Sequence, residues 1–330
     1  MAVMLDALEL RRGQRVLEIG AGTGYNASLI AKIVGDTGSV TAIDIDPDLV
    51  SRARRAIRRA GSRARVVAGD GYAGVARYGP YDRVIATAST SVVPRAWWEQ
   101  LVPDGLLEVP LILFDNGGWQ SQQVVVFRRT EAGFRSVVRN PGGFMAMRGS
   151  SKDPAPVIST PSIGAFTIDR RKGGTRYPAF LTGKPIRGLG DEEAARLVRL
   201  VLGKPRVERI APPASSGALQ TFLALSLPKD LLVTFASLGR TGTGVLGSQL
   251  EGVAVTARKN RGATDLLAFG ARSAEKPLRA AIESWRAAGS PRDRDLEIAV
   301  TFDRKPVAWR VFKRGDCYIA LNWRRGGRHP

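Results

Sequence analysis

The segment Val16–Tyr25, VLEIGAGTGY, constrains the fold more than any other part of the chain. Its apolar start predicts a buried β-strand, and glycine then stands at every second position, at Gly20, Gly22 and Gly24. Glycine is required where the backbone approaches a ligand closely or adopts a positive φ. A helical pattern follows over Tyr25–Val34, so the amides at its start can face an anionic or polar group. The segment therefore predicts a strand, a glycine turn and a helix that together hold a ligand.

The spacing of the glycines does not favour a nicotinamide or flavin dinucleotide as that ligand. The dinucleotide fingerprint is G-x-G-x-x-G, whereas this turn reads G-x-G-x-G. Tyr25 stands where the fingerprint has its third glycine, so NAD or FAD fits less well than another adenosine-containing cofactor.

Short apolar runs alternate with helical patterns over the first half of the chain. Besides the strand within Arg15–Ile19, strands are predicted at 39–43, 65–68, 83–87, 106–113 and 123–128, and helices at 47–60 and 95–101. This alternation predicts an α/β fold with a doubly wound, mostly parallel Rossmann-like sheet, in which ligands bind at the carboxyl ends of the strands.

Two acidic residues follow the second and third predicted strands. Asp44 ends the second strand, and Asp70 stands between Gly69 and Gly71 after the third. A carboxylate at the first place can accept hydrogen bonds from both hydroxyls of a ribose, and one at the second from the exocyclic amine of adenine. Together with the glycine turn, these acids predict a site for an adenosine that carries a sulfonium amino acid.

The composition changes after residue 148. Residues 149–190 are rich in proline and glycine, which indicates a linker, and several strand patterns with few helices follow. Strands are predicted at 231–235, 253–257, 265–269, 296–302, 307–312 and 318–321, and helices at 191–202, with Asp191 as the N-cap, and at 277–288. We therefore predict a first domain over 1–148, a linker over 149–190 and a basic C-terminal α+β domain over 191–330.

Charge and rare residue types limit the chemistry. The net charge is +20, of which residues 1–150, with 19 basic and 14 acidic side chains, contribute only +5. A basic second half fits either a polyanionic partner or a solvated surface. The single histidine, His329, and the single cysteine, Cys317, do not favour histidine-based hydrolysis, a metal site or a disulfide. Since no run of 18 apolar residues and no secretory signal occur, we expect a cytoplasmic protein without a membrane partner.

Five segments together resemble the protein-L-isoaspartate O-methyltransferases. They are VLEIGAGTGYNASLIA, AIDID, GDGYAGV, YDRVIATAS and LVPDGLLEVP, and the similarity covers about residues 3–148. The resemblance implies a class I methyltransferase fold, S-adenosyl-L-methionine as cofactor, and the carboxylate of an L-isoaspartyl or aspartyl residue in a protein or peptide as acceptor. It also implies that the methyl ester then cyclises to a succinimide, which leads to repair or modification of the substrate.

The resemblance and the strand-end pattern define the residues expected at the site. The cofactor-binding set comprises Glu18, Gly20, Ala21, Gly22, Thr23, Gly24, Asp44, Ile45, Gly69, Asp70 and Gly71, and the substrate-side set comprises Thr87, Ala88 and Ser89. The serine that the family uses lies in a Ser-Gln-Pro loop before the helix near Ala2. It has no counterpart from Met1 onward, so no catalytic residue is assigned. Because that loop covers the methyl donor, we expect a form extended before Met1 to be more active than the 330-residue form.

Methyl transfer to a carboxylate is not expected to need a general base. A carboxylate is already ionised at neutral pH and the sulfonium methyl is already activated, so alignment supplies most of the catalysis. Two other functions stay open: a nucleic-acid methyltransferase, suggested by the basic second half, and a cofactor-binding scaffold without catalysis. Nucleic acid is not the expected substrate, because Thr87–Ser89 stands where base-amine methyltransferases have an Asn/Asp-Pro-Pro-aromatic motif, and Cys317 lies outside the first predicted domain.

Three smaller motifs can be explained by local structure, and for one of them binding stays an alternative. Gly242–Gly247 matches G-x-G-x-x-G but precedes a strand-like run, so a turn is expected. The segment 309–325 interleaves aromatic and basic residues, which suits base stacking, the binding of a peptide, or alternation within strands. A solvated helix face is expected for the arginines Arg52, Arg54, Arg55, Arg58 and Arg59.

Overall fold

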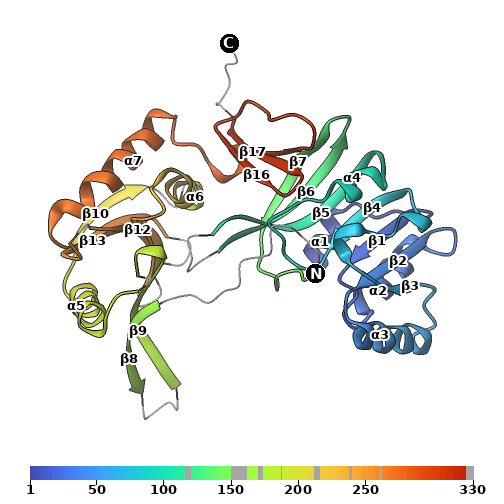
Figure 1. Ribbon diagram of the computed structural model, residues 1–330, viewed down its shortest axis with the longest axis horizontal. Helices are drawn as coiled ribbons and strands as arrows, with labels where there is room; N and C mark the ends of the chain where they lie inside the picture. Colours follow the sequence, from blue (N-terminus) through green and yellow to red (C-terminus); the bar gives the residue numbers. More distant parts are fainter. Residues whose placement is uncertain are drawn as a thin grey trace. The chain divides into compact units, whose positions relative to one another are not determined.

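The chain divides into two units, each with its own sheet (Figure 1). A computed structural model describes residues 1–115, 120–149, 162–169, 174–186, 188–211, 216–237, 240–247, 249–259 and 262–324. The first unit comprises 1–113, 122–157 and 297–322, and the second comprises 114–121, 158–296 and 323–330. Each unit is therefore assembled from segments that are distant in the sequence.

The first sheet contains the predicted parallel strands in a doubly wound order. Its parallel part is ordered β3-β2-β1-β4-β5, so the chain runs outward from β1 in both directions. The bounds are β1 (Arg15–Ile19), β2 (Ser39–Asp44), β3 (Arg65–Ala68), β4 (Tyr81–Ala86) and β5 (Leu101–Asp115). The predicted α/β fold with a mostly parallel central sheet is confirmed, and the point where the strand order reverses lies at the carboxyl ends of β1 and β4.

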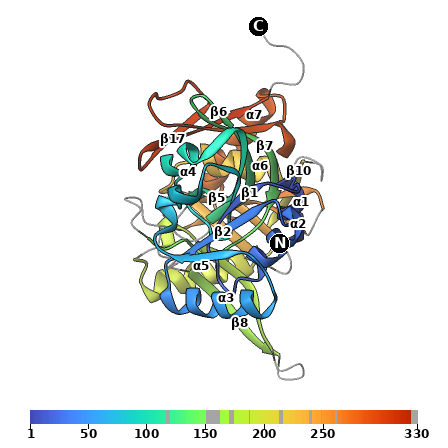
Figure 2. The same cartoon turned by 90° about the vertical axis from the view of Figure 1, so that its right-hand side faces the viewer.

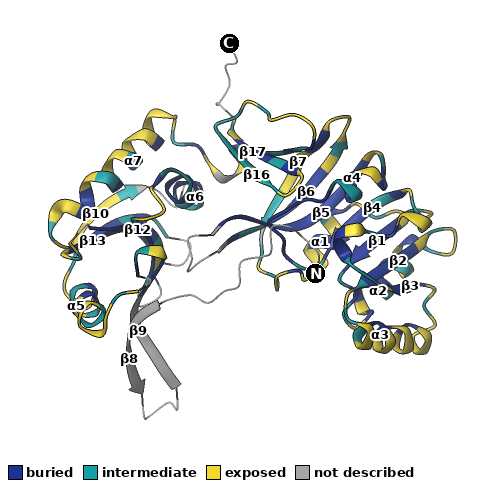
Figure 3. Cartoon of the chain, in the orientation of Figure 1, coloured by how far each residue is buried: buried dark blue, intermediate teal, exposed yellow. Residues whose placement is uncertain are grey.

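Helices cover both faces of this sheet. The helices are α1 (Ala2–Ala7), α2 (Tyr25–Val34), α3 (Pro47–Arg59) and α4 (Arg95–Glu99), with short 3-10 turns η1 (Gly71–Ala73) and η2 (Ala76–Tyr78). One buried cluster joins α1, α2 and α3 to the sheet, as in Ile30, Ala53 and Ile85. On the other face Trp97 of α4 is fully buried and donates to the Gly71 carbonyl at 2.9 Å. Figure 2 shows α2 and α3 beside the parallel strands, and Figure 3 shows the buried central strands and the exposed outer side of α3.

The first sheet continues beyond β5 with the two strands that follow it in the sequence and with three strands from the last part of the chain. These strands are β6 (Gln120–Thr130), β7 (Gly133–Pro141), β15 (Leu296–Thr301), β16 (Arg310–Arg314) and β17 (Cys317–Trp323). The order is β5-β6-β7-β15-β17-β16, and Val300 of β15 pairs antiparallel with Phe134 of β7. Figure 1 shows β16 and β17 beside β6 and β7. The division of the chain thus differs from the predicted domains, because the open edge of β7 pairs with strands that the sequence placed in the C-terminal domain.

The second unit is built on an antiparallel sheet of seven strands. Its order is β10-β14-β13-β12-β11-β9-β8. The bounds are β8 (Ser162–Asp169), β9 (Gly174–Thr182), β10 (Arg206–Ala211), β11 (Leu232–Ser237), β12 (Arg240–Leu246), β13 (Gly252–Lys259) and β14 (Thr264–Gly270). The helices α5 (Asp191–Leu202), α6 (Ser216–Ser226) and α7 (Glu275–Ala287) pack against it. Because β8 and β9 belong to this sheet, residues 162–169 and 174–182 are strands rather than part of a linker.

Two local predictions in this unit were wrong. Residues 242–246 lie within strand β12 and not in a turn, because Gly242 and Gly244 let β13 approach closely: a Cβ on Gly242 would lie 1.7 Å from the Thr256 carbonyl oxygen. Asp191 lies in the first turn of α5, whereas Gly190 is the N-cap and its amide donates to the Glu193 carboxylate at 3.0 Å.

No helix among the described residues is long and apolar enough to span a membrane.

Candidate functional site

The glycine turn after β1 adopts a backbone conformation that only glycine accepts at low cost. The φ angles of Gly20, Gly22 and Gly24 are +93°, +51° and +77°. The amides of Gly20 and Ala21 donate to the Ile43 carbonyl at 2.8 and 3.1 Å, which fixes the turn over the end of β2. A Cβ on Gly22 would contact no other described part of the chain within 4 Å. The turn therefore leaves open space beside Gly22 for a ligand that approaches the backbone.

Two neighbours hold the ends of this turn. The Thr87 hydroxyl donates to the carbonyls of Gly20 at 2.7 Å and Ile19 at 3.1 Å, so the residue after β4 fixes the first glycine. At the other end, a Cβ on Gly24 would lie 3.0 Å from Ile57 of α3. Gly24 thus allows α2 and α3 to pack closely, while Gly22 between them stays accessible.

Asp44 at the end of β2 organises the turn and keeps acceptor capacity. Its Oδ2 accepts the Gly22 amide at 2.9 Å, and its Oδ1 accepts the Asp46 amide at 3.1 Å. Each carboxylate oxygen can accept a second hydrogen bond, so two ribose hydroxyls can still be bound. The next residue, Ile45, is an exposed apolar side chain that suits the face of a flat ring.

Asp70 and its glycines follow β3, next to Asp44 in the sheet. The Gly69 amide donates to the Asp44 carbonyl at 3.0 Å, which joins the two strand ends. Asp70 Oδ1 accepts the Tyr72 amide at 3.0 Å and begins η1. Gly71 is buried, and a Cβ there would lie 2.6 Å from Ile19. The structure thus brings the glycine turn and both predicted acids to one edge of the sheet, and of the remaining predicted residues Ala21 is buried and Thr23 exposed.

Glu18 of β1 is a buried carboxyl beneath the glycine turn. Its Oε1 accepts from the Asn26 amide group at 2.8 Å, while Glu18 Oε2 and Asn26 Oδ1 have no partner among the described residues. Burial raises the pKa of Glu18 to about 8, although the hydrogen bond from Asn26 acts to lower it, and the nearby charge of Asp44 acts in the same direction as burial. Glu18 was expected at the site, whereas Asn26 was missed, although a polar residue on the apolar side of a helix was a visible signal.

Glu108 of β5 is a second buried carboxyl in the same row of the sheet. Ile85 of β4 pairs with Glu18 on one side and with Glu108 on the other, so the two carboxyl-bearing residues lie two strand spacings, about 10 Å, apart. Glu108 is fully buried and neither of its oxygens has a partner in the described part of the chain. Burial raises its pKa to about 8, against the lowering effect of the Met1 amino group. The lone charge within LLEVPLIL was the sequence signal for this residue.

A segment after β7, residues 142–149, crosses the strand ends and covers part of the site. Ser89 pairs with it through two backbone bonds, from its amide to the Met145 carbonyl at 2.8 Å and from the Met147 amide to its carbonyl at 2.7 Å. Farther along, the Arg148 guanidinium lies 3.8 Å from the Asp46 carboxylate. A Cβ on Gly149 would lie 2.3 Å from Asp70 Oδ1, so this segment reaches the third strand end.

The three predicted substrate-side residues lie in different surroundings. Thr87 and Ala88 are half-buried, and Thr87 supports the glycine turn as described. Ser89 is fully buried, and its hydroxyl donates to the Phe144 carbonyl at 3.2 Å. Their contact with a substrate stays a prediction.

Cys317 lies in the first unit, on β17, although the sequence placed it in another domain. Its side chain is fully buried, and burial raises its pKa to about 11. The thiol is therefore protonated at neutral pH, which does not suit a nucleophile for cytosine methylation.

Aromatic and basic side chains alternate in the hairpin of β16 and β17. The Arg310 guanidinium lies 5.1 Å from the Trp309 ring, and the Lys313 amino group lies 4.3 Å from the Tyr318 ring. These contacts within the hairpin account for part of the pattern in 309–325. His329 and Arg325 lie outside the described residues.

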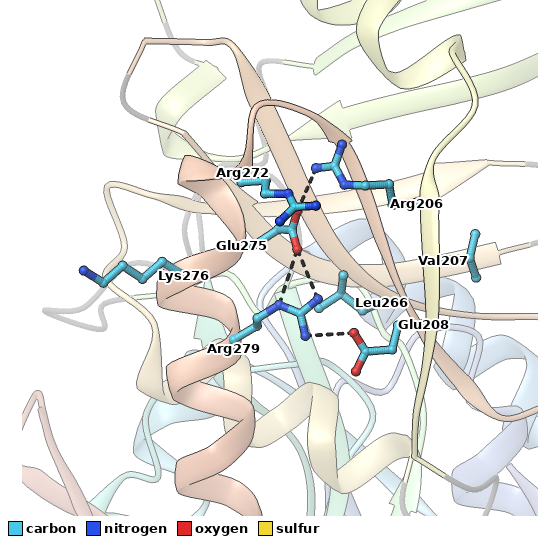
Figure 4. A pocket seen from close by; sticks show the side chains of 8 residues that line it. All are labelled: Arg206, Val207, Glu208, Leu266, Arg272, Glu275, Lys276 and Arg279. Atoms are coloured by element: carbon cyan, nitrogen blue, oxygen red, sulfur yellow. Dashed lines mark hydrogen bonds and ion pairs between the residues drawn. The ribbon is translucent and has the colours of Figure 1, made fainter.

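A cavity of about 580 Å³ in the second unit lies between β10, β14 and the start of α7 (Figure 4). Figure 4 shows the Glu275 carboxylate between two guanidinium groups, at 2.6 Å from Arg206 and 3.1 Å from Arg279. Arg279 also contacts Glu208 at 2.8 Å. This chain of ion pairs ties the edge strand β10 to α7, so we interpret it as a structural connection between the two elements.

The first part of the chain is similar to known proteins. Residues 1–141 match the family model described as Protein-L-isoaspartate(D-aspartate) O-methyltransferase (PCMT). Protein-L-isoaspartate O-methyltransferase 2 of Archaeoglobus fulgidus is 36% identical over 134 residues, which are 40% of this chain and 58% of that protein. The protein-L-isoaspartate O-methyltransferase of Methanococcoides burtonii is 37% identical over 134 residues, which are 40% of this chain and 63% of that protein.

The chain therefore spans about 60% of the length of these relatives. A solved structure described as a protein-L-isoaspartate O-methyltransferase aligns with 98% of this chain and 79% of its own, with a TM-score of 0.48 and 20% identity.

Proposed function

We propose that this chain, whose residues 1–141 match the model of the protein-L-isoaspartate(D-aspartate) O-methyltransferase family, methylates a carboxylate of a protein or peptide. In the proposed reaction the methyl group moves from the sulfur of S-adenosyl-L-methionine to an oxygen of an L-isoaspartyl or aspartyl carboxylate. The products are a methyl ester and S-adenosylhomocysteine. The ester then cyclises when the next backbone amide attacks it and methanol leaves.

The strand-end residues fit the cofactor. The open space beside Gly22 admits a close approach to the backbone, and a ligand there lies at the start of α2. Asp44 retains acceptor capacity for the ribose hydroxyls, and Ile45 exposes an apolar surface for the base. Asp70 lies one strand farther out, and in the proposed complex its carboxylate accepts a hydrogen bond from the adenine amine. When bound, the cofactor supplies a methyl group that its positive sulfur already activates.

The chain's own contribution to transfer is alignment and exclusion of water. The acceptor is ionised at neutral pH, so no side chain has to remove a proton from it. Glu18 and Glu108, whose pKa values burial raises to about 8, are mostly protonated at pH 7 and do not repel an anionic acceptor. The segment 142–149, tied to Ser89, shields the strand ends from solvent, which favours a reaction that competes with water.

The observation that carries this proposal is the position of Asp44, which holds the Gly22 amide at 2.9 Å and still has free acceptor capacity beside the open turn. We expect Asp44→Ala to weaken S-adenosylmethionine binding by about 1–3 kcal/mol, because ribose hydroxyls lose their acceptor. Isothermal titration calorimetry measures this, with Asp48→Ala as the control on the exposed start of α3. Equal affinities of the wild type and the Asp44 variant would contradict the assignment.

The transfer itself is tested with a tritiated-methyl assay on an isoaspartyl peptide and its normal aspartyl twin. We expect label in the isoaspartyl peptide that is lost on incubation, because the ester cyclises and releases methanol. Binding of the cofactor without transfer to either peptide would instead favour the non-catalytic scaffold, and transfer to nucleic acid would favour the other alternative.

A further inference from the structure

A groove on the first unit is lined by four arginines, and no carboxylate is among the described residues that line it. It has a volume of about 370 Å³ and lies between α3, the start of β3 and η2. The basic residues that line it are Arg54, Arg58, Arg65 and Arg77, together with Tyr78. This groove lies at the amino end of β3, whereas Asp70 follows the carboxyl end, so it is separate from the strand-end site.

The four arginines come from three elements and have defined positions. Arg54 and Arg58 are one turn apart on α3, and Arg54 Nε donates to the Val66 carbonyl at 2.9 Å. The guanidinium carbon of Arg65 lies 3.9 Å from the centre of the Tyr78 ring, and that of Arg77 lies 4.7 Å from it. One tyrosine thus orients two guanidinium groups, which keeps most of their N–H donors available.

The positive charge of the four arginines has no counter-charge among the described residues that line the groove. Arg58 offsets the partial negative charge at the carboxyl end of α3, but Arg65 and Arg77 are not on that helix. Among the described residues Arg63 forms an ion pair with Asp36, and neither of these two residues lines the groove. Like charges that converge from separate elements repel one another, so a bound anion would stabilise the arrangement.

We propose that the groove binds a small phosphate-bearing anion with more than one negative charge, of the diphosphate class. A planar guanidinium group can donate to two phosphate oxygens at once. Four such groups suit a ligand with several negative charges better than a ligand with a single carboxylate. The volume admits a ligand of this size. The proposal does not depend on the proposed methyl transfer, because it uses none of the strand-end residues.

The test is calorimetric titration of the full chain with inorganic pyrophosphate. We expect saturable binding of one pyrophosphate per chain, weakened at least about tenfold in Arg58→Ala/Arg77→Ala, because each lost guanidinium removes charge-assisted hydrogen bonds. The matched control is Arg55→Ala/Arg59→Ala, which removes the same charge from exposed positions of α3 outside the groove. This control should change the affinity less than about threefold, since only long-range attraction is lost.

Three results would overturn the proposal: no binding by the wild type, equal weakening in both double variants, or binding of a single-stranded oligonucleotide that pyrophosphate does not displace. The second indicates a diffuse basic surface, and the third indicates a nucleic-acid surface. Thermal unfolding of both variants checks that the fold is intact, and Arg58→Lys, which keeps the charge but loses the fork, should also weaken binding.

Discussion

The buried carboxyl group of Glu108 in the first sheet should make the stability of the protein depend on pH. Both of its oxygens are buried and unpartnered among the described residues, so ionising it in the folded protein is costly. The variant Glu108→Gln keeps the shape of the side chain and removes the titration. Its stability should therefore depend less on pH than that of the wild type.

The magnitude follows from the pKa of Glu108, which burial raises from its usual 4.5 to about 8. Between these values the folded protein binds the proton more tightly than the unfolded chain, so stability is greatest at low pH and falls as pH rises. Midway in this interval each pH unit costs about 1.4 kcal/mol, and the slope is smaller near the two pKa values, so the total loss between pH 5 and pH 8 is about 3–4 kcal/mol. Glu18 adds a similar loss, but it is present in both proteins and cancels in their difference.

The assay is urea unfolding of both proteins at pH 5, 6, 7 and 8, followed by far-ultraviolet circular dichroism. We expect the wild type to lose about 3–4 kcal/mol more than Glu108→Gln across this range. Glu131→Gln, an exposed glutamate in the turn between β6 and β7, is the control and should leave the pH profile unchanged. Parallel profiles for the wild type and Glu108→Gln would refute the argument that this carboxyl is held in a dry, unpartnered position.

Two further substitutions test the packing of each unit. Gly24→Ala should destabilise the protein by about 1 kcal/mol more than the control Gly61→Ala, as measured by urea unfolding. Both glycines have a positive φ, so both variants carry the same backbone cost. Only the methyl group at position 24 would lie 3.0 Å from Ile57 and crowd it. Glu275→Gln should cost about 1–3 kcal/mol and Glu283→Gln, which breaks an exposed pair on the same helix, less than about 0.5 kcal/mol. Burial acts to raise the pKa of Glu275, but hydrogen bonds from its two arginines outweigh it and lower the pKa, so its contribution should be present above pH 4.5 and disappear as pH falls below that value.

The sequence by itself determined the parts of the site that follow one another along the chain. The strand Arg15–Ile19 and the helix Tyr25–Val34 were predicted with the bounds that the structure has, because the apolar runs and the glycines between them are local signals. Asp44 was placed correctly beside the glycine turn for the same reason. Parallel strands in sequence order put their carboxyl ends at one edge, so residues after consecutive strands meet there without further information.

Only the tertiary structure decided what depends on contacts between distant segments. Helix α6 was missed because its residues are apolar around most of their circumference, so no amphipathic period identifies it. Nothing local to β15 indicates that it pairs with β7 of the first sheet and not within the second, because an open strand edge accepts any partner with a matching face. The pairing of strands also decides two features of the site. It sets the backbone hydrogen bond between Ser89 and Met145. It also places Glu18 and Glu108 on either side of Ile85 in the sheet. Register is set by the packing of whole sheets and helices, which a single stretch of sequence does not contain.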